Sequence, residues 1–107
     1  MRQREIIALF DDEVKTVYGW YAQGQEPERP YRVLNYLNSN GMDADNIRYC
    51  PVDRWQLDLI TDKRDEDLEK FTEEALLNAG LNFSKTQEPD AADQRIRMIY
   101  RFNTIGE

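Results

Sequence analysis

The sequence predicts a single α+β domain spanning residues 1–107, in which an antiparallel sheet of three to four strands has two helices packed on one face. Three observations lead to this fold class. The chain of 107 residues is long enough for one hydrophobic core and too short for two. Segments with apolar residues at helical spacing occur among segments with apolar residues at strand spacing. Their order, α-β-β-α-β-β, lacks the repeated βα alternation of a parallel, doubly wound sheet.

The first element is expected to be a helix over residues 3–18. Its apolar residues follow one helical stripe, and Gly19 comes directly after it as a candidate C-terminal stop. The stripe consists of Ile6, Leu9, Phe10, Val14 and Val17. The next segment, Tyr21–Pro30, contains Gly24 and two prolines among polar residues, so it is expected to be a loop.

Two strands are expected after this loop. The first is Tyr31–Leu37, and the Asn-Ser-Asn-Gly cluster at 38–41 consists of turn-forming residues that should end it. The second is Ile47–Thr61, which is interrupted by Pro51 because proline cannot donate a ladder hydrogen bond. Beyond the proline, apolar and polar residues alternate as in a half-buried strand: Trp55, Leu57 and Leu59 against Arg54, Gln56 and Asp58.

The second half of the chain predicts a helix and a closing strand. Asp65–Ala79 has acidic residues in its first turn and Gly80 just past its end, which is typical of a helix. Leu81–Lys85 is a candidate for a short edge strand, and a loop with Pro89 follows. Residues 95–102 alternate between two faces. The expected core is Ile6, Leu9, Phe10, Val14, Trp55, Leu57, Leu59, Leu68, Phe71, Ala75, Ile96, Met98, Tyr100 and Phe102.

Charge and hydropathy exclude several classes of partner. Lys and Arg total 14 against 21 Asp and Glu, for a net charge of −7. Direct nucleic-acid binding and binding to anionic membranes are therefore not expected, because both depend on clustered cations. No stretch approaches the roughly 18–20 apolar residues of a membrane span, and no secretory signal is recognisable at Met1–Phe10, so we expect a cytoplasmic protein.

The residues that usually carry catalysis are missing or isolated. The chain has no histidine, which removes imidazole triads and the commonest general base, and its single cysteine, Cys50, resembles a small buried hydrophobe. The acidic runs at 11–13 and 43–46 lack the spacing of a metal site and are interpreted as solvated surface. No glycine-rich phosphate loop is present. We therefore expect no enzymatic activity, no metal and no cofactor.

One face of the predicted sheet is the main candidate interface. Two helices can cover only one face, so the other should be open and carry mixed charge. Its expected residues are Arg54, Gln56, Asp58, Ile60, Arg95, Arg97, Ile99 and Arg101. Cross-strand charge pairing and docking of an acidic partner are both compatible with this pattern.

Trp20 and Tyr21 are a second candidate, either as a cap on the core or as an exposed aromatic anchor. The loops Tyr21–Pro30 and Lys85–Asp93 are further candidates.

Several segments together resemble a known family. They are the run Val14-Lys15-Thr16-Val17-Tyr18, the strand entry at 30–34, the block Trp55–Asp65, the acidic helix through Gly80 and the strand Ile96–Phe102. Over residues 5–103 the chain resembles the tail-terminator or tail-completion proteins of long-tailed bacteriophages, which are minor capsid components. The likeness is one of pattern and includes no invariant signature. Cys50-Pro51 and the poorly patterned first strand depart from the family.

The resemblance implies a non-catalytic virion protein. Such a protein would form a ring homo-oligomer, usually a hexamer, and would contact tail-tube protein on one side and the head connector on the other. It would be found in the host cytoplasm during assembly and then in the virion tail. The alternative from another class is a small acidic inhibitor or nucleic-acid mimic that binds a basic host protein. The two alternatives differ in whether the protein self-associates or binds a basic partner in a strongly salt-dependent way.

Overall fold

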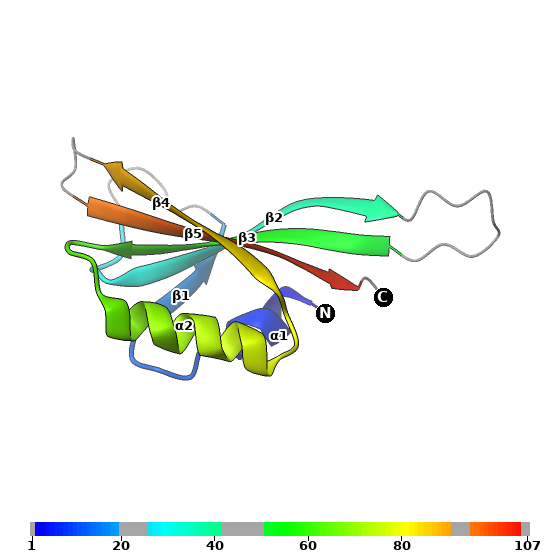
Figure 1. Ribbon diagram of the computed structural model, residues 1–107, viewed down its shortest axis with the longest axis horizontal. Coiled ribbons are helices and arrows are strands. Elements are labelled where there is room, and N and C mark those ends of the chain that lie inside the picture. The colour runs from blue at the N-terminus through cyan, green and yellow to red at the C-terminus, as the bar shows by residue number, and fades with distance from the viewer. Residues whose placement is uncertain (1, 20–25, 42–50, 91–94, 106–107) are drawn as a thin grey trace.

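The computed structural model describes residues 2–19, 26–41, 51–90 and 95–105. These residues form two helices and a five-stranded sheet, and the sheet has the strand order β1-β2-β3-β5-β4 (Figure 1). All neighbouring strands are antiparallel except β1 and β2, which are parallel. The elements are α1 (Gln3–Ile7), β1 (Lys15–Tyr18), β2 (Tyr31–Gly41), β3 (Pro51–Thr61), α2 (Glu66–Asn78), β4 (Phe83–Asp90) and β5 (Arg95–Ile105).

Both helices lie on the same face of the sheet, which we call the helix face (Figure 1). The main core lies between these helices and the sheet. Helix α1 contributes Ile6, α2 contributes Leu76, and the sheet contributes alternate residues of its central strands. The molecule is elongated, at 49 × 29 × 22 Å. One end of β2, β3 and β5 projects past both helices, and we call it the projecting end (Figure 1).

The helix predicted over Asp65–Ala79 is confirmed as α2. The side chain of Asp65 accepts a hydrogen bond from the backbone N–H of Leu68 at 3.1 Å and caps the N-terminus. The helix ends before Gly80, whose φ of +79° is a conformation that favours glycine. The expected core is wrong at Phe71 of this helix, because Phe71 is 37% exposed and Leu76 is fully buried instead.

The predicted helix over residues 3–18 is wrong beyond Ile7. The chain makes one short helix, and then Lys15–Tyr18 forms β1, which pairs with Tyr31–Leu34 of β2. A run of β-branched residues around position 16 fits a strand better than a helix, and pairing with β2 decides the outcome. Phe10 still reaches the main core, whereas Val17 packs on the other side of the sheet. The sheet is therefore mixed rather than antiparallel.

The predicted turn at 38–41 is also wrong. These residues continue β2 and pair with β3, from Asn38 opposite Arg54 to Gly41 opposite Pro51. A bulge between Tyr36 and Asn38 shifts the register. Local turn propensity is overridden because the long ladder with β3 satisfies the backbone hydrogen bonds of this stretch. Residues 47–50 of the predicted second strand lie outside the described residues.

The candidate edge strand Leu81–Lys85 is confirmed as β4, but β4 begins at Phe83 and extends through part of the predicted loop. Residues 85–90 belong to β4 and pair with β5, so the loop expected over Lys85–Asp93 is wrong as far as Asp90. Proline at position 89 is compatible with this assignment because β4 is the edge strand. The order is thus α-β-β-β-α-β-β, with five strands instead of three to four. The closing strand is confirmed and extends to Ile105.

Candidate interaction surface

The candidate residues of β3 and β5 lie on the sheet face opposite the helices, which we call the second face. The register pairs Gln56 with Arg101, Asp58 with Ile99, and Ile60 with Arg97. Side chains directly opposite each other in a ladder share a face, and alternate residues along a strand share it too. The grouping expected from the sequence is therefore present, although its two halves differ in exposure.

The half of the second face near β1 is closed. Tyr31, Val33 and Ile60 are fully buried there and form a small apolar cluster, against which Val17 packs. Asp58 and Ile99 are also buried. The expectation that the second face is open along its whole length is wrong in this closed half, which consists of Tyr31, Val33, Asp58, Ile60 and Ile99. The segment before β2 crosses this side of the sheet, since Glu26 reaches Arg95 of β5, and Val17 of β1 adds apolar surface beside the cluster.

Carboxylates neutralise the arginines at the edge of the closed half. Glu26 Oε1 accepts a hydrogen bond from Arg95 Nη1 at 3.2 Å, and it also accepts from Arg29 Nε at 3.0 Å and the Tyr31 hydroxyl at 2.9 Å. The Arg29 hydrogen bond is the main cause that lowers the pKa of Glu26. Arg97 Nε lies 3.8 Å from Asp58 Oδ2. These contacts are the cross-strand and loop charge pairing that the sequence pattern allowed.

Asp58 is the buried charge of the second face. Its Oδ1 accepts a hydrogen bond from Gln56 Nε2 at 2.9 Å, but its Oδ2 has no hydrogen-bond partner within the described part of the chain. Burial raises the pKa of this carboxyl group, and the Gln56 hydrogen bond and the Arg97 charge only partly oppose the rise. The closed half therefore contains a carboxylate that the fold leaves incompletely compensated.

The other half of the second face is open. Arg54 and Arg101 are exposed there on adjacent strands, and Arg101 Nε donates a hydrogen bond to Gln56 Oε1 at 3.1 Å. A hollow of about 530 Å³ lies at this place, and its lining includes Leu37, which is 41% exposed. We call this the open half and define it as Leu37, Arg54, Ser84, Arg101 and Asn103.

The helix face buries a different charge. Arg32 is fully buried, and its Nη1 and Nη2 donate to Asp12 Oδ1 and Oδ2 at 2.9 and 2.7 Å. Its Nε donates to Thr72 Oγ1 at 3.1 Å, and its guanidinium lies 4.7 Å from the ring centroid of Phe10. The hydrogen bond from Arg32 is the main cause that lowers the pKa of Asp12.

This clamp was missed in the sequence, where Asp12 was interpreted as solvated surface. An arginine inside the apolar run 31–34 was the signal that could have revealed it, because a buried guanidinium requires an acidic partner. The clamp joins the segment after α1 to β2 and α2, so its role is structural.

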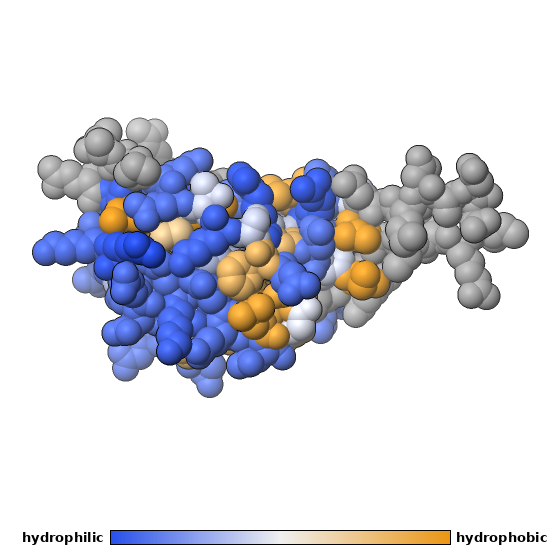
Figure 2. All heavy atoms as spheres, viewed as in Figure 1, coloured by the Kyte–Doolittle hydropathy of each residue, from blue (hydrophilic) through white to orange (hydrophobic). Residues whose placement is uncertain are grey.

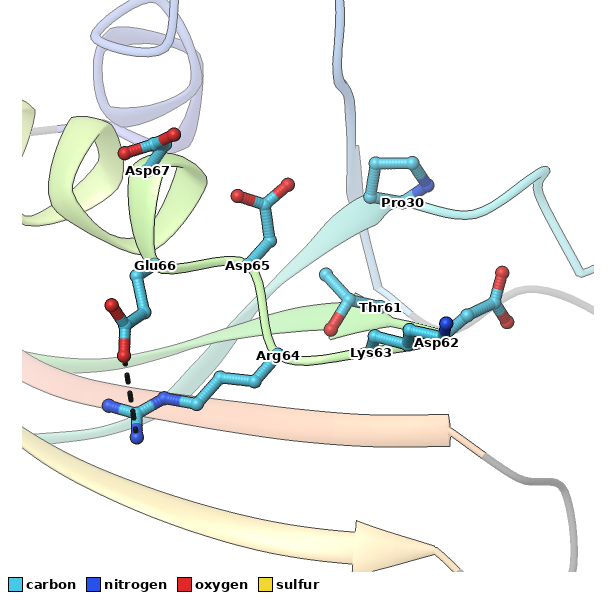
Figure 3. A pocket seen from close by; sticks show the side chains of 8 residues that line it. All are labelled: Pro30, Thr61, Asp62, Lys63, Arg64, Asp65, Glu66 and Asp67. Atoms are coloured by element: carbon cyan, nitrogen blue, oxygen red, sulfur yellow. Dashed lines mark ion pairs between the residues drawn. The ribbon is translucent and has the colours of Figure 1, made fainter.

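A hollow of about 660 Å³ lies between the end of β3 and the start of α2 (Figure 3). Three of its four carboxylates have partners: Asp65 caps α2, Asp62 accepts from Arg29 Nη1 at 2.8 Å, and Glu66 lies 4.0 Å from Arg64. Figure 3 shows that these side chains point in different directions and do not converge on one point. The hollow is therefore a polar surface depression and lacks the arrangement of a catalytic or metal site.

The remaining candidates either lie outside the described residues or do not form a site. Trp20, Tyr21, Cys50 and the acidic run at 43–46 lie outside the described residues. Within the described ranges, no three His, Cys, Asp or Glu side chains gather in a way that could hold a metal ion. No helix in those ranges is both long and apolar enough to cross a membrane.

Comparisons with known proteins assign neither a family nor a role to this chain. No family model matches the chain, and no curated protein sequence matches it significantly. A chain in the solved structure "Virion of native gene transfer agent (GTA) particle" superposes with a TM-score of 0.49 at 18% sequence identity, covering 84% of this chain and 78% of that one. A likeness at this level assigns no role to the protein.

Proposed function

We propose that the protein is a non-enzymatic structural component of a phage-like virion. In this proposal it is a tail-terminator or tail-completion protein that assembles into a ring, usually a hexamer in the family it resembles, and joins the tail tube to the head connector. The resemblance over residues 5–103 supports the proposal at the level of sequence pattern. The geometry of the sheet supports it at the level of surface.

The observation that carries the proposal is the projecting end of the sheet, which exposes apolar side chains. Tyr36 and Leu37 of β2 and Ile105 of β5 are each more than 40% exposed, and Ile105 reaches 61%. In Figure 2 the hydrophobic side chains in view gather where α2 gives way to β4 and beside this end of the sheet, whereas hydrophilic ones cover most of the rest. Apolar groups held clear of a core are typical of an interaction surface.

The projecting end is braced internally, which suits a docking element. The rings of Tyr36 and Trp55 meet edge to face at 5.1 Å between centroids. Trp55 Nε1 donates to Thr104 Oγ1 at 2.9 Å, and the Tyr36 hydroxyl donates to Asp53 Oδ1 at 3.1 Å. These contacts hold the exposed apolar residues in place before a partner arrives, which lowers the entropic cost of binding.

Electron microscopy of concentrated protein, alone and mixed with isolated phage tails, tests this proposal. We expect wild-type protein to form closed rings or to decorate one end of the tails. The variant Leu37→Asp with Ile105→Asp should remain monomeric and folded. The control Leu77→Asp on α2 removes a leucine that is 53% exposed, compared with 41% for Leu37, away from the projecting end, and it should assemble normally.

Two outcomes would contradict the proposal. One is a wild-type protein that neither self-associates nor binds tails. The other is salt-sensitive binding to a basic host protein without any association with tails, which is the behaviour of the acidic inhibitor or nucleic-acid mimic.

A further inference from the structure

Charge balance differs sharply between the two halves of the second face. In the closed half Arg95 pairs with Glu26, and Arg97 lies beside Asp58. In the open half Arg54 forms no ion pair or hydrogen bond with the described residues, and Arg101 contacts only the neutral Gln56. The protein carries 21 acidic side chains and a net charge of −7, yet no described carboxylate forms an ion pair with either guanidinium, and the buried Asp58 interacts with Arg101 only through its charge.

The two guanidiniums lie close together. Gln56 is opposite Arg101 and Arg54 is opposite Asn103, so Arg54 and Arg101 are diagonal neighbours on one face. Diagonal neighbours in an antiparallel ladder lie roughly 7–8 Å apart at their backbones, within reach of long side chains. Two carboxylates on one short segment could therefore meet both guanidiniums, and each could accept a bidentate hydrogen bond.

The shape of the surface adds a second requirement. Both arginines line the hollow of about 530 Å³, and the exposed Leu37 lines it as well. An occupant that fits must present carboxylates together with an apolar group. A nucleic acid offers phosphates but fits less well, because two cations in a strongly acidic protein provide little of the phosphate neutralisation on which such binding depends.

We infer that the open half binds an acidic, carboxylate-bearing segment of a partner protein, with Arg54 and Arg101 as the carboxylate contacts and Leu37 as the apolar contact. This inference rests on the proposed assembly function and names the chemistry of the partner surface. Guanidinium groups on a rigid sheet accept a planar anion without rearrangement of the fold.

Fluorescence anisotropy with a labelled peptide of four glutamates around one leucine tests the inference. At low ionic strength we expect binding in the millimolar range or tighter, with backbone NMR shifts confined to the strands of the open half. Arg54→Glu with Arg101→Glu should weaken binding by at least about tenfold, since like charges then face each other. Arg54→Gln with Arg101→Gln is the milder variant. Lys63→Glu with Lys70→Glu, which changes the net charge by the same amount at exposed positions away from the open half, should bind like wild type.

Three results would overturn the inference. They are the absence of binding by wild-type protein, equal binding by the arginine variants, and tighter binding of a ten-residue oligothymidylate than of the peptide. A peptide with glutamine in place of glutamate should bind at least about tenfold more weakly. If the peptide fails but the protein still assembles on tails, only this inference falls. If the peptide binds but neither rings nor tail association occur, the proposed function falls and the acidic-segment site remains.

Discussion

Among the described strand residues, each face of the sheet buries one charged side chain, and the two side chains are compensated differently. On the helix face Arg32 has three hydrogen bonds to side chains and a carboxylate partner at 2.7 Å. On the second face Asp58 keeps one oxygen without a hydrogen-bond partner among the described residues, and its nearest cation is 3.8 Å away. The helix face is thus built for stability, whereas the second face tolerates incomplete compensation.

The largest effect should come from breaking the Arg32 clamp. Asp12→Asn leaves a fully buried guanidinium without a charged partner, so it should lower the free energy of unfolding by about 3–5 kcal/mol. Urea denaturation followed by circular dichroism measures the change. Asp11→Asn is the matched control, because Asp11 is exposed, and it should change stability by less than about 0.5 kcal/mol. A loss below about 1 kcal/mol for Asp12→Asn would mean that the clamp contributes little.

Two substitutions on α2 should have the next largest effects on the free energy of unfolding. Leu76 is fully buried in the main core, so Leu76→Ala should cost about 2–5 kcal/mol. Phe71 is 37% exposed and lies 5.8 Å from the Arg32 guanidinium, so Phe71→Ala should cost only about 1 kcal/mol. The same denaturation experiment ranks them. The reverse ranking would restore the helix orientation expected from the sequence, in which Phe71 faces the core.

Replacement of Asp58 should have the smallest effect on stability. Asp58→Asn removes a buried charge and keeps the oxygen that accepts from Gln56, so we expect a change of less than about 1 kcal/mol, or a gain, at pH 7. A loss above about 3 kcal/mol would show that the pair with Arg97 compensates the carboxylate fully. Arg97 is the neighbouring group that such a result would implicate.

The pH dependence of stability separates the two carboxylates. The pKa of Asp12 is lowered in the folded state, so its contribution is present above its ordinary value of 3.8 and is lost as the pH falls through the lowered folded value. The pKa of Asp58 is raised, so its contribution is present below 3.8 and is lost as the pH rises through the raised folded value. Denaturation at several pH values should show the Asp12→Asn loss and any Asp58→Asn gain both shrinking in acid. A pH-independent difference for either variant would contradict the assigned shift.

Sequence reasoning succeeded where local chemistry decides the structure. The cap at Asp65, the stop at Gly80 and the alternation of residues 95–102 are encoded within a few residues, and α2 and β5 follow from them. It failed where distant partners decide. Residues 15–18 become a strand only because β2 lies beside them, and the turn-forming cluster at 38–41 is straightened by its ladder with β3.

The candidate surface shows the same contrast between local and distant effects. Alternation placed the β3 and β5 residues on one face correctly, because the period of two is local. Their exposure was not predictable, since the cover over Ile60 and Ile99 depends on the long-range arrangement of the sheet. A double variant at Arg97 and Ile99 would therefore put a charge into a buried position and would test folding rather than docking. Arg54 and Arg101 are the exposed positions that test docking.

Hydrogen–deuterium exchange of the protein with and without isolated tails tests the central claim most directly. The projecting end and open half are proposed to dock, so residues 52–56 and 101–105 should exchange more slowly when tails are present. The amides of α2, which faces away from this surface, should not change. Protection confined to α2, or unchanged exchange throughout a sample in which the protein is bound to tails, would contradict docking through the second face.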